Sequence, residues 1–379
     1  MASDACKQAL KLLARSKNVL ISGPPGTGKS KLLAEVALAF ETGFGITPAG
    51  GPPKLNPQGG IPIPPAAGAT NPDIPAPSKT SRKVFRTVFH QNSKHRDFVS
   101  GITPAVSKAA GGPDFVVVAG TLYRASEHAL GPHAGASLLI IDEINRGPAV
   151  QVFGGAIVAI EPDKRLAPDG SKRAETQYFE MLNPKDGAII EYALPHDLYI
   201  LAAMNQADAS VEPLDVAFLR RWEPMRLEPD EKALRDFYGL GAKTAVPLID
   251  VPTSAAEAFE ASVRAWCAVN EQIALGRGPE FQIGHGVLMT GGVAAGMSKD
   301  AALAVLCVGW AKVRSHVDEV FFGDTRGIAA ALNALDGPAF NPFKLVETTF
   351  ADDLRFRLEG PANFSAANIY PALRAFARG

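Results

Sequence analysis

The sequence predicts an α/β fold in which a parallel sheet is followed by a helical domain. An apolar strand at Asn18–Ser22 runs through a glycine-rich turn into a helical segment, Lys31–Phe40, which is how many parallel α/β sheets begin. Two further apolar runs, Ser137–Ile141 and Leu198–Met204, have the continuous hydrophobicity of strands buried on both faces. Beyond about Pro229 the strand signals thin out and helical patterns dominate.

Composition is that of a globular protein with two folding units. The chain has 379 residues, 46% of them hydrophobic and 20% charged, and a formal net charge of −1. No global positive field attracts nucleic acid or anionic lipid. The first residues lack a signal peptide, and no apolar run approaches the roughly 18 residues of a membrane span. We therefore expect a soluble, cytoplasmic protein without a membrane partner.

Three widely spaced cysteines, Cys6, Cys267 and Cys307, form neither a disulfide framework nor a zinc spacing. We expect all three to be small buried residues.

The remaining elements are expected in chain order around a domain boundary near Pro229. A nucleotide-binding α/β domain would cover 1–229 and a helical lid with a C-terminal tail would cover 230–379. The first domain should hold an amphipathic helix, two further regular stretches, another helix and a hairpin, at Ala5–Ala14, Lys83–His90, Phe115–Val118, Val150–Ile160 and Tyr178–Leu194. The lid helices should lie at Ser254–Ala274, Lys299–Val320 and Gly327–Leu335.

An insertion rich in Pro, Gly and Ala occupies residues 43–80. Such a composition forms neither a helix nor a central strand, so it predicts a long extended segment on the surface. A disordered loop is favoured over an arm that packs on a neighbouring subunit.

A phosphate-binding loop follows the first strand. The residues that fit the pattern G-x-x-x-x-G-K-[ST] are Gly23, Pro24, Pro25, Gly26, Thr27, Gly28, Lys29 and Ser30. Glycines let the backbone N–H groups face phosphate, and the helix that follows directs its positive dipole end at the same anion. Lys29 would reach the β- and γ-phosphates, and the Ser30 hydroxyl would ligate Mg²⁺.

Two carboxylates end the strand Leu138–Ile141, at the sheet edge where parallel α/β folds bind ligands. Asp142 would hold Mg²⁺ through its water shell, and Glu143 would orient and deprotonate the attacking water. Acids often end strands, so this signal gains its weight from the complete phosphate loop upstream.

Asn205 ends the next buried strand, where its carboxamide could hydrogen-bond both the γ-phosphate and the lytic water. Arg220 and Arg221 then stand together at a helix end. A guanidinium donated by a neighbouring subunit can stabilise the charge that develops during phosphoryl transfer, and either arginine could supply it.

These motifs together resemble the McrB-like branch of AAA+ proteins, in the dynein-related and MoxR-like clade. The segments that carry the resemblance are the phosphate loop, Ile141–Arg146, Ala203–Asp208, Leu214–Arg221, Phe89–Pro104, Phe281–Gly286 and Glu319–Asp324. The resemblance covers roughly Val19 to Leu335. It implies a P-loop AAA+ αβα sandwich with a parallel sheet, followed by a helical lid.

The resemblance also implies a function. It suggests a nucleoside-triphosphate hydrolase that works with Mg²⁺ at subunit interfaces of a homo-oligomeric, hexameric ring and drives a partner or polymer. By position, Asn205 would be the first sensor, Glu143 the catalytic acid, and Arg220 or Arg221 the arginine that acts in trans. Asn145 and Arg146 match a further candidate pair for intersubunit contact. ATP is favoured as substrate, although the branch also uses GTP.

Three departures from the family pattern bear on the partner. Ala209 stands where an arginine is frequent, no base-reading domain precedes the phosphate loop, and the 43–80 insertion has no recognised counterpart. A DNA-directed role would therefore act through a separate effector or recognition subunit. The alternatives are a MoxR-like chaperone acting on proteins and a nucleotide-switched oligomeric scaffold.

Overall fold

The computed structural model describes residues 3–43, 74–76, 78–105, 115–131, 135–207, 214–243, 248–294 and 296–378. Most of the insertion predicted at 43–80, and Ala209, lie outside these ranges. The chain divides into two compact units. The first holds Met1–Ser22 and Lys29–Arg226, and the second holds Gly23–Gly28 and Leu227–Gly379.

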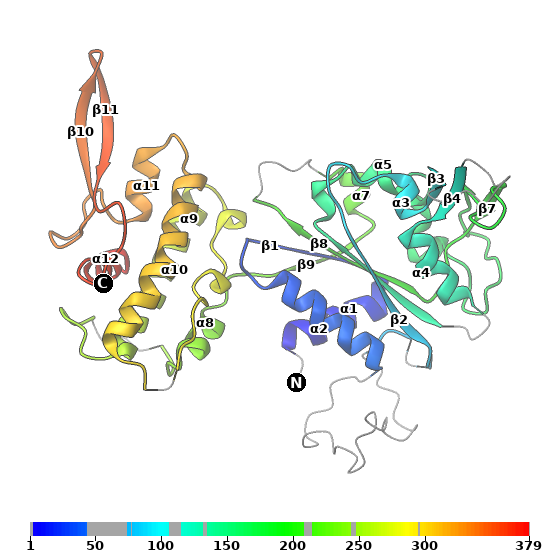
Figure 1. Ribbon diagram of the computed structural model, residues 1–379, viewed down its shortest axis with the longest axis horizontal. Coiled ribbons are helices and arrows are strands. Elements are labelled where there is room, and N and C mark those ends of the chain that lie inside the picture. The colour runs from blue at the N-terminus through cyan, green and yellow to red at the C-terminus, as the bar shows by residue number, and fades with distance from the viewer. Residues whose placement is uncertain are drawn as a thin grey trace, which may run out of the picture. The chain divides into compact units, whose positions relative to one another are not determined.

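The first unit is built on a five-stranded sheet, which confirms the predicted parallel α/β fold (Figure 1). The strand order is β2-β5-β8-β1-β9, with parallel pairing between β2 and β5, β5 and β8, and β1 and β9. The bounds are β1 (Asn18–Gly23), β2 (Arg82–Val88), β5 (Ala136–Asp142), β8 (Leu198–Asn205) and β9 (Glu223–Arg226). β9 was not anticipated, because it is short and contains Pro224, a residue that strands tolerate mainly at a sheet edge.

Helices cover both faces of this sheet, so its strands are apolar throughout. Leu139 and Ile141 of β5 pack in one cluster with residues of α4 (Thr121–Leu130), α5 (Ala149–Phe153) and α6 (Ala156–Ala159). The intervening Leu138 and Ile140 point to the opposite face and are equally buried. α1 (Asp4–Ser16) and α2 (Lys29–Thr42) contact the strands as well. Figure 1 shows α1 and α2 side by side.

Two hairpins extend the first unit beyond the central sheet. β6 (Phe179–Leu182) and β7 (Ile189–Tyr192) are antiparallel, which confirms the hairpin predicted there. β3 (Ser100–Pro104) pairs with β4 (Phe115–Ala119) in a second antiparallel pair, next to the short helix α3 (His95–Phe98). The single helix predicted at Val150–Ile160 is instead split into α5 and α6, because Gly154 takes a backbone conformation outside the helical region.

The second unit is mainly helical, as predicted, around the paired helices α9 (Ala255–Gly276) and α10 (Lys299–Val320). Shorter helices complete it: α8 (Glu231–Tyr238), α11 (Thr325–Ala331) and α12 (Ile369–Phe376). A reciprocal cap between Ser254 and Glu257 starts α9. The predicted helix at Gly327–Leu335 starts two residues earlier and is shorter.

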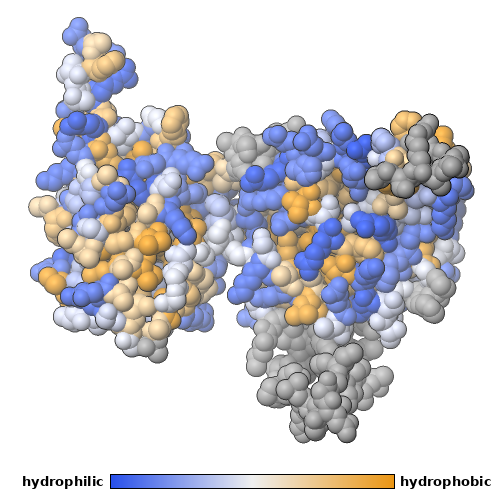
Figure 2. Space-filling view, viewed as in Figure 1, coloured by the Kyte–Doolittle hydropathy of each residue, from blue (hydrophilic) through white to orange (hydrophobic). Residues whose placement is uncertain are grey.

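A projecting hairpin of β10 (Lys344–Phe350) and β11 (Asp353–Glu359) was not anticipated from the mixed sequence near the C-terminus. Hydrophobic surface is visible toward its free end (Figure 2), where Phe350 and Leu354 are exposed.

The tryptophans and cysteines differ in their burial. Trp222, Trp266 and Trp310 are buried packing residues. Cys6 is fully buried, but Cys267 and Cys307 are only partly buried, so the expectation for these two was wrong. Both lie on long amphipathic helices at the margin of the core rather than within it. Within the described ranges, no helix is long and apolar enough to cross a membrane.

Candidate active site

Polar side chains follow two neighbouring strands of the central sheet where those strands end. β5 ends at Asp142, with Glu143 directly after it, and β8 ends at Asn205. The two strands are paired in parallel, so their carboxyl ends meet at one edge of the sheet. The structure therefore brings together three of the side chains that the sequence singled out.

Glu143 is held on both carboxylate oxygens. Asn205 donates from Nδ2 to Oε1 at 2.8 Å, and Arg146 lies 3.0 Å from Oε2. The Glu143 backbone has φ 53° and ψ 44°, a left-handed conformation that costs energy for a residue with a side chain. Its N–H donates to Asp142 Oδ1 at 3.0 Å. This turn sets the two neighbouring carboxylates in distinct positions.

Asn145 holds the end of β8 through a hydrogen bond to its backbone. Its Nδ2 donates to the Asn205 carbonyl at 2.7 Å, and the residue is only 4% exposed. This bond holds Asn205 from within the same chain. The intersubunit contact that the resemblance implied for Asn145 stays a prediction.

Lys29 is the cation of this cluster. It begins α2 and is only 9% exposed, and burial lowers the pKa of its ammonium to about 8. The carboxylates of Glu143 and Asp142 act in the opposite direction and favour the charged form. Burial also raises the pKa of the Asp142 carboxyl; the hydrogen bond from the Glu143 N–H opposes this, and the Glu143 carboxylate adds to it. Lys29 thus lies in the electrostatic field of both acids.

The loop before Lys29 has the backbone that a phosphate cradle needs. Gly26 and Gly28 have φ of 79° and 87°, a region that side chains other than glycine rarely enter. The Thr27 hydroxyl donates to the Pro24 carbonyl at 2.9 Å and closes the loop on itself. A 14-residue helix follows directly, so its N-terminal dipole adds to the loop's N–H groups.

The two arginines at the end of α7 (Val216–Leu219) are placed differently. The Arg221 side chain is 7% exposed, with Nε 2.9 Å from Glu161 Oε1. It also donates to the Ala217 carbonyl. Arg220 is exposed. The Arg221 side chain is therefore bound within its own chain, whereas the exposed Arg220 side chain can contact another molecule.

The oxygen donors suit a magnesium ion held together with a bound phosphate. Ser30 and Asp142 offer a hydroxyl and a carboxylate, and hard Mg²⁺ prefers such ligands in small number, completed by water and phosphate oxygens. No cluster of three or more His, Cys, Asp or Glu side chains suited to a metal occurs in the described part of the chain. These residues therefore do not form a metal site whose ligands all come from the protein.

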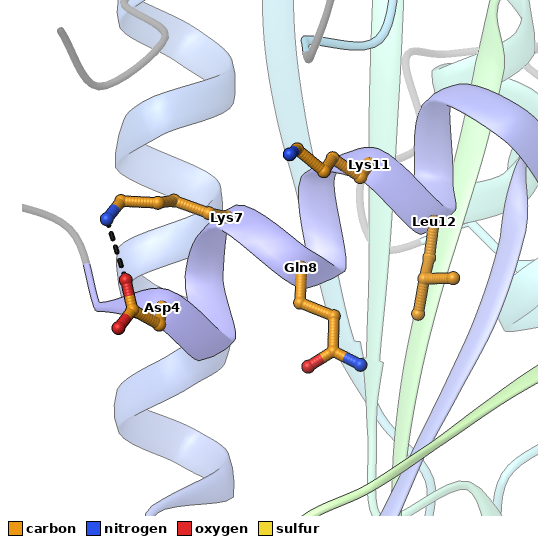
Figure 3. A pocket seen from close by; sticks show the side chains of 5 residues that line it. All are labelled: Asp4, Lys7, Gln8, Lys11 and Leu12. Atoms are coloured by element: carbon orange, nitrogen blue, oxygen red, sulfur yellow. Dashed lines mark hydrogen bonds and ion pairs between the residues drawn. The ribbon is translucent and has the colours of Figure 1, made fainter.

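One surface depression lies apart from this cluster. Its lining residues are Asp4, Lys7, Gln8, Lys11 and Leu12, and all belong to α1 (Figure 3). Lys7 pairs with Asp4 at 2.7 Å on the outside of the helix. A depression along one helix with no second wall does not enclose a ligand.

Residues 77–222 match the model of the AAA domain, dynein-related subfamily. The matched segment contains Asp142, Glu143, Asn205 and both arginines. This segment is an AAA domain of the dynein-related subfamily. Two curated relatives support the McrB-like branch within it.

The relatives are both components of restriction systems. The EcoKMcrB subunit of the type IV methyl-directed restriction enzyme of Escherichia coli K12 is 26% identical over 230 residues. The YdiS component of the type II restriction enzyme BsuMI of Bacillus subtilis 168 is 31% identical over 230 residues. The matches cover 60% and 58% of this AAA+ chain, and 39% and 60% of the relatives. The chain therefore spans only part of each.

Solved structures with some likeness include NtrX of Brucella abortus and PCH-2 of C. elegans. Both are 12% identical, with TM-scores of 0.32 and 0.30. They cover 86% and 73% of this chain, and the likeness spans 64% and 62% of those structures. The assignment rests on the family match and on the sheet topology, not on these two.

Two features of the site were missed from the sequence. The pairing of Arg146 with Glu143 could have been found from their spacing of three residues, which places side chains on one side of a helical turn. The second feature is a contact between the phosphate loop and the segment around Gly284. The glycines on either side of His285 were the only local signal, and they do not identify the phosphate loop as the partner.

Proposed function

We propose that this AAA+ protein binds a nucleoside triphosphate with Mg²⁺ and hydrolyses it between subunits of a ring. The observation that carries the proposal is the convergence of Lys29, Asp142 and Glu143, with Asn205 bonded to the Glu143 carboxylate. A lysine, a metal-binding acid, a base and a carboxamide sensor are the groups that phosphoryl transfer to water requires.

Each group has a separate task in this proposal. Lys29 and the loop N–H groups would hold the phosphates, and Ser30 and Asp142 would hold Mg²⁺, which would supply positive charge to neutralise the phosphates. Glu143 takes a proton from the attacking water. Asn205 orients both Glu143 and the γ-phosphate without adding charge. Arg220 would come from the neighbouring subunit, which makes hydrolysis dependent on assembly.

The partner proposal follows the relatives. Both relatives are named as components of restriction enzymes, so we propose that the chain is the motor or remodelling subunit of a restriction or defence complex with a separate effector. DNA would be reached through that other subunit. ATP is the proposed substrate, with GTP as the competitor.

Steady-state phosphate release from ATP and GTP tests the proposal directly. Specific activity should rise with protein concentration, because the catalytic arginine comes from a neighbour. A specific activity that stays constant across the range in which rings assemble would contradict catalysis between subunits. The nucleotide with the higher kcat/KM identifies the substrate.

Nucleotide binding should take up a proton near pH 8. Because the pKa of Lys29 is about 8 in the free protein, roughly half of its side chains are neutral at that pH. Bound phosphate favours the ammonium and raises the pKa, so binding should take up about half a proton. Titration calorimetry at pH 8 in buffers of different ionisation enthalpy measures this uptake.

Lys29→Arg is the matched control, because its guanidinium is charged throughout this pH range. Any binding that it retains should proceed without proton uptake. Uptake of equal size in both proteins would assign the proton to another group.

A nucleotide-switched scaffold is the second candidate, and the double hold on Glu143 favours it. A base paired with Arg146 on one oxygen and with Asn205 on the other is poorly placed to accept a proton from water. Turnover would then stay slow until a partner releases the glutamate.

Arg146→Ala should raise basal phosphate release by about two- to fivefold, the factor for a half-exposed ion pair worth about 0.5–1 kcal/mol. Arg146→Lys keeps a cation there and should change turnover less. A loss of turnover in Arg146→Ala would instead indicate that Arg146 acts on the nucleotide.

A further inference from the structure

The phosphate loop is joined by two backbone hydrogen bonds to a short segment that lies far along the chain. Gly284 donates its N–H to the Pro25 carbonyl, and Gly286 donates its N–H to the Gly26 carbonyl, each at 2.9 Å. Both partners belong to the same compact unit. The loop's outward carbonyls are therefore satisfied by the chain itself.

The contact is so close that it requires glycine on both sides. A Cβ on Gly284 would lie 2.0 Å from the Gly26 carbonyl carbon, and one on Gly286 would lie 2.8 Å from the Gly26 oxygen. A Cβ on Gly26 would lie 2.7 Å from Val287 Cγ2. At Gly284 and Gly286 the nearest atoms are backbone atoms of the loop, so no side chain can rotate away to make room for a methyl group.

The segment is itself fixed by the second unit. Asn270, on α9, binds Ile283 at both backbone groups: its Oδ1 accepts from the N–H at 2.7 Å and its Nδ2 donates to the carbonyl at 2.9 Å. Trp266 donates from Nε1 to the same carbonyl at 3.0 Å. Asn270, Trp266 and Ile283 are 4%, 2% and 0% exposed.

The His285 ring fixes the other end of the segment. Its Nδ1 accepts from the N–H of Asp230, the residue that caps α8. The segment from Ile283 to Val287 is thus tied to two helices.

Peptide geometry gives this contact a consequence for phosphate binding. In a trans peptide the carbonyl and the following N–H point in opposite directions. When the Pro25 and Gly26 carbonyls point to the segment, the N–H groups of Gly26 and Thr27 point to the other side of the loop. Those N–H groups belong to the phosphate-binding motif.

We propose that Ile283–Val287 is a brace that preorganises the phosphate loop, so that the lid determines nucleotide affinity through Gly284 and Gly286. The inference rests on the proposed nucleotide binding. The brace removes an entropy cost that a free glycine-rich loop would have to meet on binding. By linkage, bound nucleotide should stabilise the brace as much as the brace favours nucleotide.

Gly284→Ala and Gly286→Ala test the brace, with Gly292→Ala as control. An added Cβ at Gly292 meets no atom within 4 Å. Affinity for Mg·ADP, measured with a fluorescent analogue, should fall by about tenfold or more in Gly284→Ala, by less in Gly286→Ala, and not in the control. Thermal unfolding and hydrogen exchange in α10 show whether the lid is still folded.

Hydrogen exchange adds a measurement that would not change with nucleotide if the contact had only a structural role. In the wild type, Mg·ADP should slow exchange in peptides covering 283–287 as well as 23–28. In Gly286→Ala the slowing should be confined to 23–28. Wild-type affinity in Gly284→Ala, or no nucleotide-dependent slowing at 283–287 in a wild type that binds Mg·ADP, would overturn the brace.

Failure of the proposed function has a different signature. If the wild type binds no nucleotide, the proposed function is wrong. Hydrogen exchange in the free protein then tests whether the brace exists. Slow exchange at Gly284 and Gly286 that becomes fast in Gly284→Ala would retain the contact as a structural brace of the loop. Fast exchange in the wild type would overturn it.

Discussion

Glu143→Gln should lose nearly all hydrolysis while it keeps nucleotide binding. The amide has almost the same shape as the carboxylate and can still accept from Asn205 Nδ2, but it cannot take a proton from water. A positioned general base contributes about 10²–10⁴-fold to the rate, and turnover should fall by that factor. Steady-state phosphate release checks the loss of hydrolysis, and Mg·ATP affinity measured on the same preparation checks that binding is kept.

The control for this prediction is Glu180→Gln, an exposed residue of β6. It changes the net charge equally and should leave turnover unchanged. Assembly of Glu143→Gln with Mg·ATP should also remain intact, because the arginine donated by the neighbour still meets a triphosphate. Full turnover in Glu143→Gln would remove Glu143 from the base role and with it the central assignment of the site.

The sequence predicted the central sheet well, because strands buried on both faces have a hydrophobic pattern that local reasoning can detect. β1, β5 and β8 are such strands, and their ends carry the site. β9 was not predicted, because a four-residue edge strand with a proline and two charged residues has no such pattern. Its place beside β1 is fixed by tertiary pairing, which a local window does not contain.

The candidate site was predictable as a set of residue types but not as a set of contacts. Motif spacing named Lys29, Asp142, Glu143 and Asn205, because the carboxyl ends of adjacent parallel strands converge. Burial of Asn145 and the bond from Gly284 to Pro25 depend on segments that are distant in sequence. Neither periodicity nor composition encodes contacts between such distant segments, so only the three-dimensional structure reveals them.

The choice between Arg220 and Arg221 shows the same limit, because adjacent identical residues have the same sequence signal. The Arg221 side chain is 7% exposed and paired with Glu161, whereas Arg220 is exposed. A residue that must reach a neighbouring nucleotide cannot also be buried against its own fold. We therefore propose Arg220 as the arginine that acts in trans.

Arg220→Ala should lower turnover by roughly 10³–10⁵-fold, the contribution of an arginine finger, with thermal stability unchanged. Arg221→Ala should lower stability by about 1–3 kcal/mol, because it leaves Glu161 and the Ala217 carbonyl without their charged partner. Phosphate release and denaturant unfolding of both variants separate the two effects.

Mixing supplies the decisive measurement for an arginine donated between subunits. Glu143→Gln lacks the base and Arg220→Ala lacks the arginine, and each is inactive by itself. If Arg220 acts in trans, an interface between one subunit of each kind joins an intact base to an intact arginine, and mixed rings regain part of the turnover. Two variants defective in the same subunit's site cannot complement each other in this way. Arg221→Ala with retained stability and lost turnover would reverse the assignment, since the buried arginine would then be the one that leaves Glu161 to reach the neighbouring phosphate.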